Sequence, residues 1–190
     1  MKLYACFFKN ADSQEQHEKA HSLLSLALKR EYGIEEYTLG KRSLGKPYLI
    51  GRSDIFINLS HCSELAVCAV GENTVGADCE VIRRVKSGVV RRVCTESEAQ
   101  EIERASEPDL AFTRLWTLKE SFVKAVGRGI SYPMKNAAFS LAGDVIHTNV
   151  TGAEFRQWVI AERYVIAVCA AQPVSDIRLE FISENEIAKK

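Results

Sequence analysis

VGADCE, residues 75–80, is the segment from which the organisation of this chain can be worked out. It has the composition of a buried strand, yet Asp78 and Glu80 stand two residues apart with Cys79 between them. Alternate residues of a strand point to the same face. The two carboxylates therefore project together, while Cys79 faces the opposite side as a small core residue. Two carboxylates on one face either lie in water, the commoner case for such a segment alone, or share a cation.

A second segment, FTRLWTLKESFVKAVGRG, predicts a helix from about Asp109 to Val126 that ends at the glycines of GRG. Its apolar stripe consists of Phe112, Leu115, Trp116, Phe122, Ala125 and Val126. Lys119 falls inside this stripe, where an ammonium is costly unless it reaches an anion. Glu120 and Lys124 lie one turn apart. Either Lys119 snorkels beside a surface Glu120–Lys124 pair, or a carboxylate and two ammoniums face a bound polyanion.

Three carboxylates on two elements suit a hard cation, because Mg²⁺ prefers oxygen ligands and is commonly completed by substrate phosphates. They are Asp78, Glu80 and Glu120. Lys46 in SLGKPYL and His61 in NLSHC are further candidate phosphate contacts near strand ends. Neither a Walker loop nor a G-x-G-x-x-G turn is present in the sequence. A solvated lysine and a structural histidine are the plainer interpretations of these two residues.

The elements around these segments suggest two similar halves. KLYACFF reads as a strand, Ser13 with Gln16 as a capping box, and Gly33 as the end of the helix that follows. Thr95 with Glu98 forms a second capping box. Further strands are expected at IFINLSH, LAVCAV, AAFSL, EFRQWVIAE, YVIAVCAA and IRLEFIS.

LAVCAV followed by VGADCE resembles IAVCAA followed by DIRLE, and each pair comes after a helix. This weak repeat predicts an α+β fold of two pseudo-repeated α/β lobes. We expect an N-terminal lobe over residues 1–85 and a C-terminal lobe over residues 86–190. The active site is expected at the interface between the lobes, where ligands often bind.

Length and composition exclude several classes of protein. The 190 residues are 46% hydrophobic and carry 25 basic and 25 acidic side chains, so a packed core is expected and a wholly basic nucleic-acid-binding surface is not. No apolar run approaches the ~20 residues of a membrane span. We therefore expect a cytoplasmic protein with no nucleic-acid or membrane partner and with six reduced cysteines. His17 and His21, spaced i, i+4, lack an evident third metal ligand.

In order along the chain, GKPYL, INLSHC, VGADCE and LWTLKESFVKAVGRGI resemble the 4′-phosphopantetheinyl transferases of the single-chain, surfactin-synthetase-activating type. The resemblance covers nearly the whole chain. Its most specific part is G-x-D-x-E followed about forty residues later by W-x-x-K-E. It implies a monomer that moves 4′-phosphopantetheine from coenzyme A to a serine of an apo acyl or peptidyl carrier protein. Adenosine 3′,5′-bisphosphate would be released.

The resemblance also implies roles for particular residues. Asp78, Glu80 and Glu120 would bind Mg²⁺; Lys119, Lys124 and His61 would hold the phosphates of coenzyme A; Lys46 would lie near its 3′-phosphate or adenosine end; and Ser60 would share the loop of His61. Lys119 and Lys124, with Mg²⁺, would stabilise the charge that develops on the diphosphate. Glu120 would take the proton of the carrier serine, directly or through a water bound to the metal.

One departure from the family concerns the 3′-phosphate. The family usually grips it with basic residues before and within the first helix, but here that segment is shortened and Ser25 stands where an arginine is expected. The residues that could substitute are Lys19, Lys29, Arg30, Lys41 and Arg42. A separate basic run is either a docking surface for an acidic carrier helix or a solvated linker. It comprises Arg83, Arg84, Lys86, Arg91 and Arg92.

Two other functions use the same residues. A Mg²⁺-dependent hydrolase of pyrophosphate-containing nucleotides would use water as the nucleophile. A non-catalytic module would only bind coenzyme A or a carrier protein, but the retained acidic trio and the helix lysines disfavour it.

Overall fold

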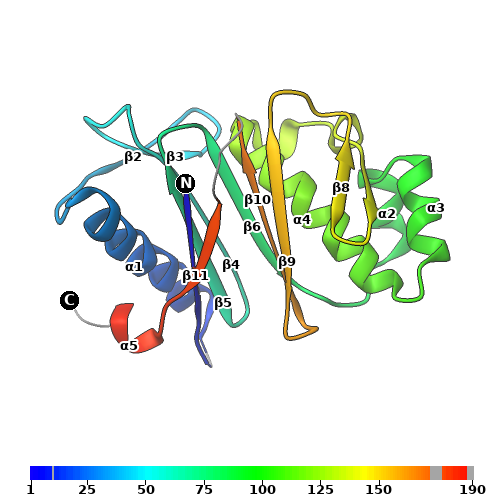
Figure 1. Cartoon of the computed structure of the whole chain (residues 1–190), viewed down its shortest axis with the longest axis horizontal. Coiled ribbons are helices and arrows are strands. Elements are labelled where there is room, and N and C mark those ends of the chain that lie inside the picture. The colour runs from blue at the N-terminus through cyan, green and yellow to red at the C-terminus, as the bar shows by residue number, and fades with distance from the viewer. Residues whose placement is uncertain (10, 172–176, 188–190) are drawn as a thin grey trace.

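The computed structural model describes residues 1–9, 11–171 and 177–187, and it contains two main β-sheets with a long helix on the outer side of each (Figure 1). The helices are α1 (Ser13–Tyr32), α2 (Ser87–Val93), α3 (Glu96–Arg104), α4 (Pro108–Val126) and α5 (Glu184–Ile187), with short 3₁₀ turns η1 (Gly129–Ser131) and η2 (Met134–Asn136). The strands are β1 (Lys2–Phe7), β2 (Leu39–Lys41), β3 (Pro47–Leu49), β4 (Phe56–Cys62), β5 (Leu65–Gly71), β6 (Val75–Val81), β7 (Phe139–Ala142), β8 (Val145–Thr148), β9 (Glu154–Ile160), β10 (Tyr164–Ala170) and β11 (Arg178–Phe181).

The first sheet has the order β11-β1-β5-β4 and is covered by α1. Every residue of β5 is buried, because both of its faces are covered. Ala66, Cys68 and Val70 pack in the cluster that includes the apolar face of α1. Leu65, Val67 and Ala69 face the other way, into an apolar cluster shared with the second sheet. A continuous apolar strand is what two covered faces require.

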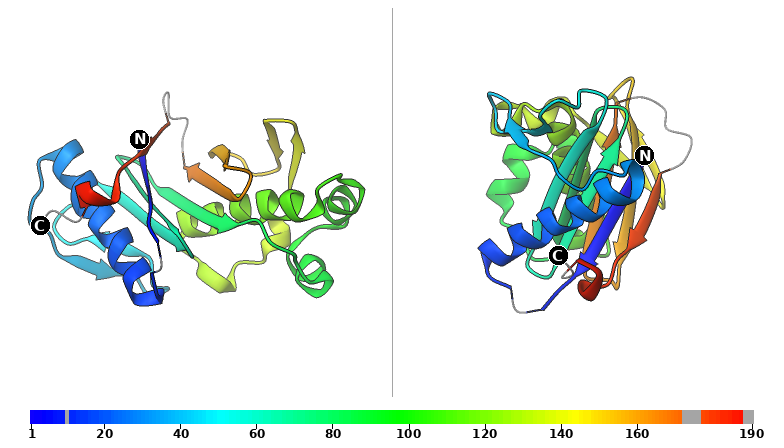
Figure 2. Two further views of the ribbon diagram at one scale, coloured as in Figure 1. Left: turned by 90° about the horizontal axis from the view of Figure 1, so that it is seen from below. Right: turned by 90° about the vertical axis from the view of Figure 1, so that its left-hand side faces the viewer.

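The second sheet has the antiparallel order β6-β10-β9 and is covered by α4. Val75, Ala77 and Cys79 of β6 lie in the cluster shared by the two sheets. Cys79 is 2% exposed, which confirms that the thiol between the two carboxylates is a core residue. The opposite face of this sheet packs on Leu115 and Leu118 of α4. Figure 2 shows α1 and α4 on opposite sides of the strands.

The observed helix ends agree closely with those predicted from the sequence. Gly33 and Gly127 cap α1 and α4 in the left-handed conformation, with φ of 65° and 71°, and Thr95 forms the expected capping box with Glu98. One cap was wrongly predicted, because α1 begins one residue earlier. Asp12, rather than Ser13, accepts the backbone N–H groups of Gln14 and Glu15.

Two further details differ from the sequence interpretation. Val126, expected in the apolar stripe of α4, is 46% exposed, because it is the last residue before the helix ends at Gly127. The basic segment after β6 is not simply a linker, since it contains α2.

The predicted α+β class is confirmed, and the strands cross between the two sheets. β6 follows β5 in the chain but pairs with β10, and β11 follows β10 but pairs in parallel with β1, with Lys2 opposite Arg178. The pairing therefore runs across the predicted lobe boundary at residue 85, and that division stays a prediction. Residues 172–176 and 188–190 of the predicted C-terminal lobe lie outside the described residues. Across the described ranges, no helix is both long and apolar enough to cross a bilayer.

Candidate active site at the junction of β4, β6 and α4

The helix α4 lies across β6 at Gly76, closer than any side chain would permit. A Cβ atom built there would lie 2.0 Å from the carbonyl oxygen of Ser121 and 2.3 Å from the backbone nitrogen of Ala125. Gly76 shares its strand face with Asp78 and Glu80, because side chains alternate along a strand. The absence of a side chain at position 76 therefore brings the two carboxylates of β6 under α4.

Lys124 of α4 reaches Asp78 and Ser60 in this junction. Its ammonium lies 2.6 Å from Asp78 Oδ1 and donates to Ser60 Oγ at 2.8 Å, and the Ser60 hydroxyl donates to the same Oδ1 at 3.0 Å. Burial lowers the pKa of Lys124, but attraction to Asp78 outweighs it and the net pKa is raised. Within the described chain, the second carboxylate oxygen of Asp78 is buried and has no hydrogen-bond partner. That unsatisfied oxygen is available to a ligand.

Glu80 and Glu120 add negative charge to the same place. Burial raises the pKa of Glu120, and repulsion from Asp78 and Glu80 adds to this against the attraction of Lys124. Burial also raises the pKa of Glu80, with a smaller contribution from Asp78. Arg83 approaches Glu80 at 3.7 Å. The structure thus gathers the three predicted metal ligands, and their mutual repulsion favours a bound cation.

The fit of this carboxylate trio to Mg²⁺ rests on its chemistry. Among the residues described, no group of three His, Cys, Asp or Glu side chains is arranged to hold a metal as it stands. The ammonium of Lys124 neutralises Asp78 instead. The orphaned Asp78 oxygen and the all-oxygen donor set nonetheless match what a hard cation needs. A cation would also relieve the repulsion between carboxylates that contributes to the raised pKa values of Glu80 and Glu120.

Lys119 does not join this cluster, contrary to the prediction that it holds phosphates. Its side chain is fully buried, and its ammonium lies 2.9 Å from Glu98 Oε1. It also donates to the carbonyl oxygens of Met134, at 3.0 Å, and Ala137. Because these three partners match the three N–H donors of an ammonium, Lys119 ties α4 to α3 and η2 rather than facing a ligand.

Lys46 and His61 flank the junction. The ammonium of Lys46 donates to the carbonyl oxygens of Val75, at 3.0 Å, and Ala125, at 2.6 Å, so it joins the start of β6 to the end of α4. Burial, with Arg42 nearby, lowers the pKa of Lys46 to about 8. His61 follows Ser60 on β4, and its Nδ1 lies 3.3 Å from Gln16 Oε1.

Two residues that organise this site were not singled out as site residues from the sequence. Asn58 is buried on β4, and its Oδ1 accepts the backbone N–H of Ala77 at 2.7 Å, which joins the two sheets. Its i, i+2 spacing to Ser60 could have revealed it, since both lie on one strand face. Glu98, predicted only as a helix cap, also accepts from Phe139 N at 2.8 Å. Lys119 in the apolar stripe of α4 was the sequence signal that a buried acidic partner such as Glu98 was needed.

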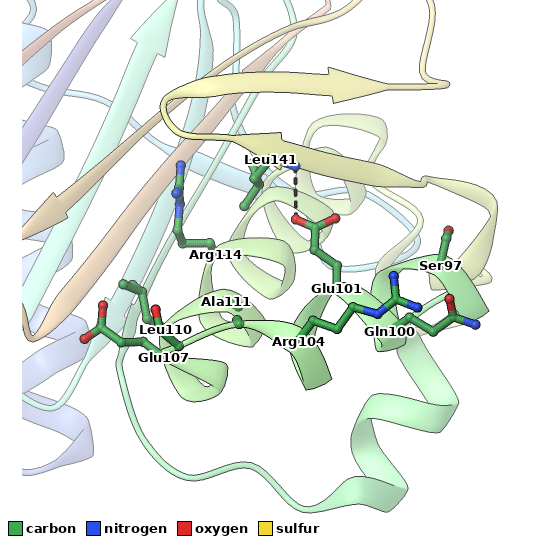
Figure 3. Close-up of a pocket in the computed structure, with 11 residues that line it drawn as sticks. Ser97, Gln100, Glu101, Arg104, Glu107, Leu110, Ala111, Arg114 and Leu141 are labelled. Carbon is green, nitrogen blue, oxygen red and sulfur yellow. Dashed lines mark hydrogen bonds between the residues drawn. The ribbon is translucent and has the colours of Figure 1, made fainter.

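A cavity elsewhere in the molecule is separate from this junction. It has a volume of about 550 Å³ and lies between α3, α4 and β7, where Glu101 accepts the backbone N–H of Leu141 at 3.1 Å (Figure 3). Arg104 and Arg114 also line it. None of the predicted site residues does, so it is not the site that the carboxylates and Lys124 form.

Comparison with known proteins identifies the class of protein. A family model, the 4′-phosphopantetheinyl transferase superfamily, matches residues 74–169, which include β6, α4 and all but the last residue of β10. The chain therefore belongs to the 4′-phosphopantetheinyl transferase superfamily, and the predicted transferase class is confirmed.

Individual relatives indicate which type of 4′-phosphopantetheinyl transferase this chain resembles. A 4′-phosphopantetheinyl transferase of Bacillus subtilis is 32% identical over 80% of this chain and 71% of its own length. The 4′-phosphopantetheinyl transferase Sfp of Bacillus subtilis strain 168 is 24% identical over 98% of this chain and its whole length. These relatives confirm the predicted surfactin-synthetase-activating type. The solved holo-[acyl-carrier-protein] synthase of Thermotoga maritima is similar over 53% of this chain and 64% of its own, with 20% identity and a TM-score of 0.45.

Proposed function

We propose that this protein transfers the 4′-phosphopantetheine group of coenzyme A to a serine hydroxyl of an apo acyl or peptidyl carrier protein. The observation that carries the proposal is the convergence of Asp78, Glu80, Glu120 and Lys124 at the β6–α4 junction. Membership of the transferase superfamily gives the reaction, and this junction offers the charged groups that a diphosphate needs.

Asp78, Glu80 and Glu120 are the residues that would hold Mg²⁺, and Asp78 Oδ2 is the oxygen free to do so. When bound, the ion would offset the negative charge of the diphosphate and polarise its phosphorus atoms. Lys124 then has a second role. Its ammonium, now on Asp78 and Ser60, would turn toward a phosphate oxygen once the carboxylate binds a metal. His61, beside Ser60, would contact the same phosphates.

The transfer forms one bond and breaks another. The serine oxygen attacks the phosphorus next to pantetheine, and the bond from that phosphorus to the bridging oxygen breaks. Adenosine 3′,5′-bisphosphate leaves with the electron pair. Glu120 takes the serine proton, directly or through one water molecule, because it is the site carboxylate carried by α4 opposite β6. Lys119 acts only by positioning, through Glu98, the helix that bears Glu120.

We further propose that the carrier docks on the basic run that follows β6. All five of its side chains are exposed around α2, namely Arg83, Arg84, Lys86, Arg91 and Arg92. A positive surface beside the site complements an acidic carrier helix. Replacing Arg91 and Arg92 by Glu should raise the KM for the carrier and leave the KM for coenzyme A unchanged.

The test incubates the protein with Mg²⁺, coenzyme A and several apo carrier proteins, and weighs each carrier by mass spectrometry. We expect the carrier to gain one phosphopantetheine group. Glu120→Gln should abolish the gain, while Glu103→Gln, on an exposed position of α3, should not affect it. Release of adenosine 3′,5′-bisphosphate without any carrier would favour the hydrolase instead. If this protein modifies none of the carriers, the transferase proposal is wrong.

A further inference from the structure

The turn between β2 and β3 holds Lys46 in a fixed place. Two backbone hydrogen bonds close this turn, from Arg42 N to Lys46 O at 2.9 Å and from Gly45 N to Arg42 O at 2.8 Å. Gly45 has a φ of 88°, a conformation that a residue with a side chain rarely adopts. The backbone of Lys46 is therefore fixed by the turn itself.

The side chain of Lys46 reaches both elements of the candidate active site. Its ammonium donates to the carbonyl oxygen of Val75 at 3.0 Å and to that of Ala125 at 2.6 Å. Its stem lies along the end of α4, since a Cβ built at Gly127 would be 3.1 Å from Lys46 Cδ. Val75 directly precedes Gly76, and Ala125 N is among the atoms that a Cβ at Gly76 would meet. Lys46 therefore joins β6 to α4 at the close approach that Gly76 permits.

Both of these carbonyl groups need a partner from outside their own element. Ala125 lies in the last turn of α4, where carbonyl oxygens have no partner within the helix and the helix dipole favours a cation. Val75 lies on β6, which is an edge strand of its sheet. Two residues further along, the N–H of Ala77 likewise donates to a side chain, that of Asn58, at 2.7 Å. Lys46 and Asn58 thus bond to the outer edge of β6 at alternate positions.

The charged groups of the site are carried by the same two elements. Lys124 directly precedes Ala125 in α4 and lies 2.6 Å from Asp78 of β6. Glu120 lies one turn before Lys124 on the same helix. Without the Lys46 ammonium, the oxygens of Val75 and Ala125 would lose this donor, and the end of α4 would be freer to move away from β6.

We propose that Lys46 is a positioning residue for the transfer. Its ammonium locks the end of α4 onto β6 and thereby sets the distances of Glu120 and Lys124 from the carboxylates of β6. The proposal rests on the proposed function, in which these groups act on the diphosphate and on the carrier serine. It differs from the role that the resemblance implied for Lys46, a contact with the 3′-phosphate or adenosine end of coenzyme A. The two roles predict different effects of one substitution.

The experiment compares Lys46→Met with the wild-type protein at about pH 7. The wild-type ammonium keeps its proton there, because burial lowers its pKa only to about 8. Methionine keeps an unbranched stem and removes the donors. The kcat for carrier modification should fall about tenfold or more, since a displacement of about 1 Å costs about a hundredfold. Isothermal titration calorimetry without carrier should give the wild-type ratio of the affinities for coenzyme A and 3′-dephospho-coenzyme A.

Two further variants isolate the contribution of the ammonium. Lys46→Arg should recover most of the lost kcat, because a guanidinium keeps the charge and supplies several N–H donors. Lys135→Met, at an exposed position of η2, is the matched control and should keep the wild-type kcat. Hydrogen exchange followed by mass spectrometry should show faster exchange in the last turn of α4 in Lys46→Met than in Lys135→Met.

Three results would overturn the inference. The first is a Lys46→Met variant with the wild-type kcat. The second is an affinity ratio that falls toward one in this variant, which would make Lys46 a contact of the 3′-phosphate. The third is unchanged hydrogen exchange at the end of α4. Each leaves the proposed function standing. A wild-type protein that modifies no carrier contradicts the proposed function instead, and hydrogen exchange then still decides whether Lys46 holds α4 on β6.

Discussion

The close approach of α4 to β6 predicts that Gly76→Ala will be far more damaging than its single methyl group suggests. The added Cβ would lie 2.0 Å from Ser121 O, and real Cβ contacts essentially never fall under 3.0 Å. Because the obstructing atoms are backbone, α4 must retreat from β6 by about 1 Å. Overpacking of this kind costs about 1–3 kcal/mol of stability. A displacement of about 1 Å at the chemistry costs about a hundredfold in rate.

Urea denaturation and carrier modification followed by mass spectrometry measure the two effects. We expect the unfolding free energy of Gly76→Ala to fall by about 2 kcal/mol and kcat/KM to fall about a hundredfold. The variant should remain folded. Gly88→Ala is the matched control, because a Cβ at that α2 position meets nothing within 4 Å. If Gly76→Ala keeps wild-type kcat/KM, then the contact between α4 and β6 does not position the site.

Two further predictions concern charge. Lys119→Met leaves the Glu98 carboxylate buried without its ion pair, so the unfolding free energy should fall by about 3–5 kcal/mol. Adding Glu98→Gln should recover part of the lost stability. Equal losses in the single and double variants would contradict the pairing of Lys119 with Glu98. The pKa values of Glu80 and Glu120 are raised in the folded protein. When EDTA removes any metal, both carboxyl groups are therefore harder to ionise in the folded state than in the unfolded state. Stability should therefore fall as pH rises above their unfolded value, about 4.3, until the raised folded pKa is passed. In urea titrations at several pH values, Glu120→Gln should make the unfolding free energy depend less on pH in this range. An unchanged pH dependence would refute the role of Glu120.

Local patterns allowed much of the site to be predicted. The period of two along β6 placed Asp78 and Glu80 together and turned Cys79 into the core. The glycines after α1 and α4 fixed the helix ends. The spacing of Glu120 and Lys124 put both on the helix edge that meets β6. Each of these properties depends on residues within one or two turns of each other.

What the sequence could not supply is the identity of partners brought together by packing. Lys119 was expected either to snorkel to solvent or to face a bound polyanion. Its partner is instead Glu98, which the contact between α3 and α4 provides. Resemblance to a family indicates which residue types stand at given positions, but not where a side chain points. In the same way, nothing local to Lys19 or Arg30 indicates that the distant α5 will neutralise them.

The crossing of β6 and β11 between the two sheets has a consequence for how the molecule assembles. A fragment that stops near residue 85 would keep β6 without β10, its hydrogen-bonding partner, and β1 without β11. Each half therefore completes the other, and the chain should unfold in one cooperative transition rather than lobe by lobe. Because Lys2 must find Arg178, much of the ladder forms between residues far apart in sequence, and folding should be slow for a domain of this size. We therefore expect the protein to behave as a single folding unit, in which a fragment ending near residue 85 would not fold by itself.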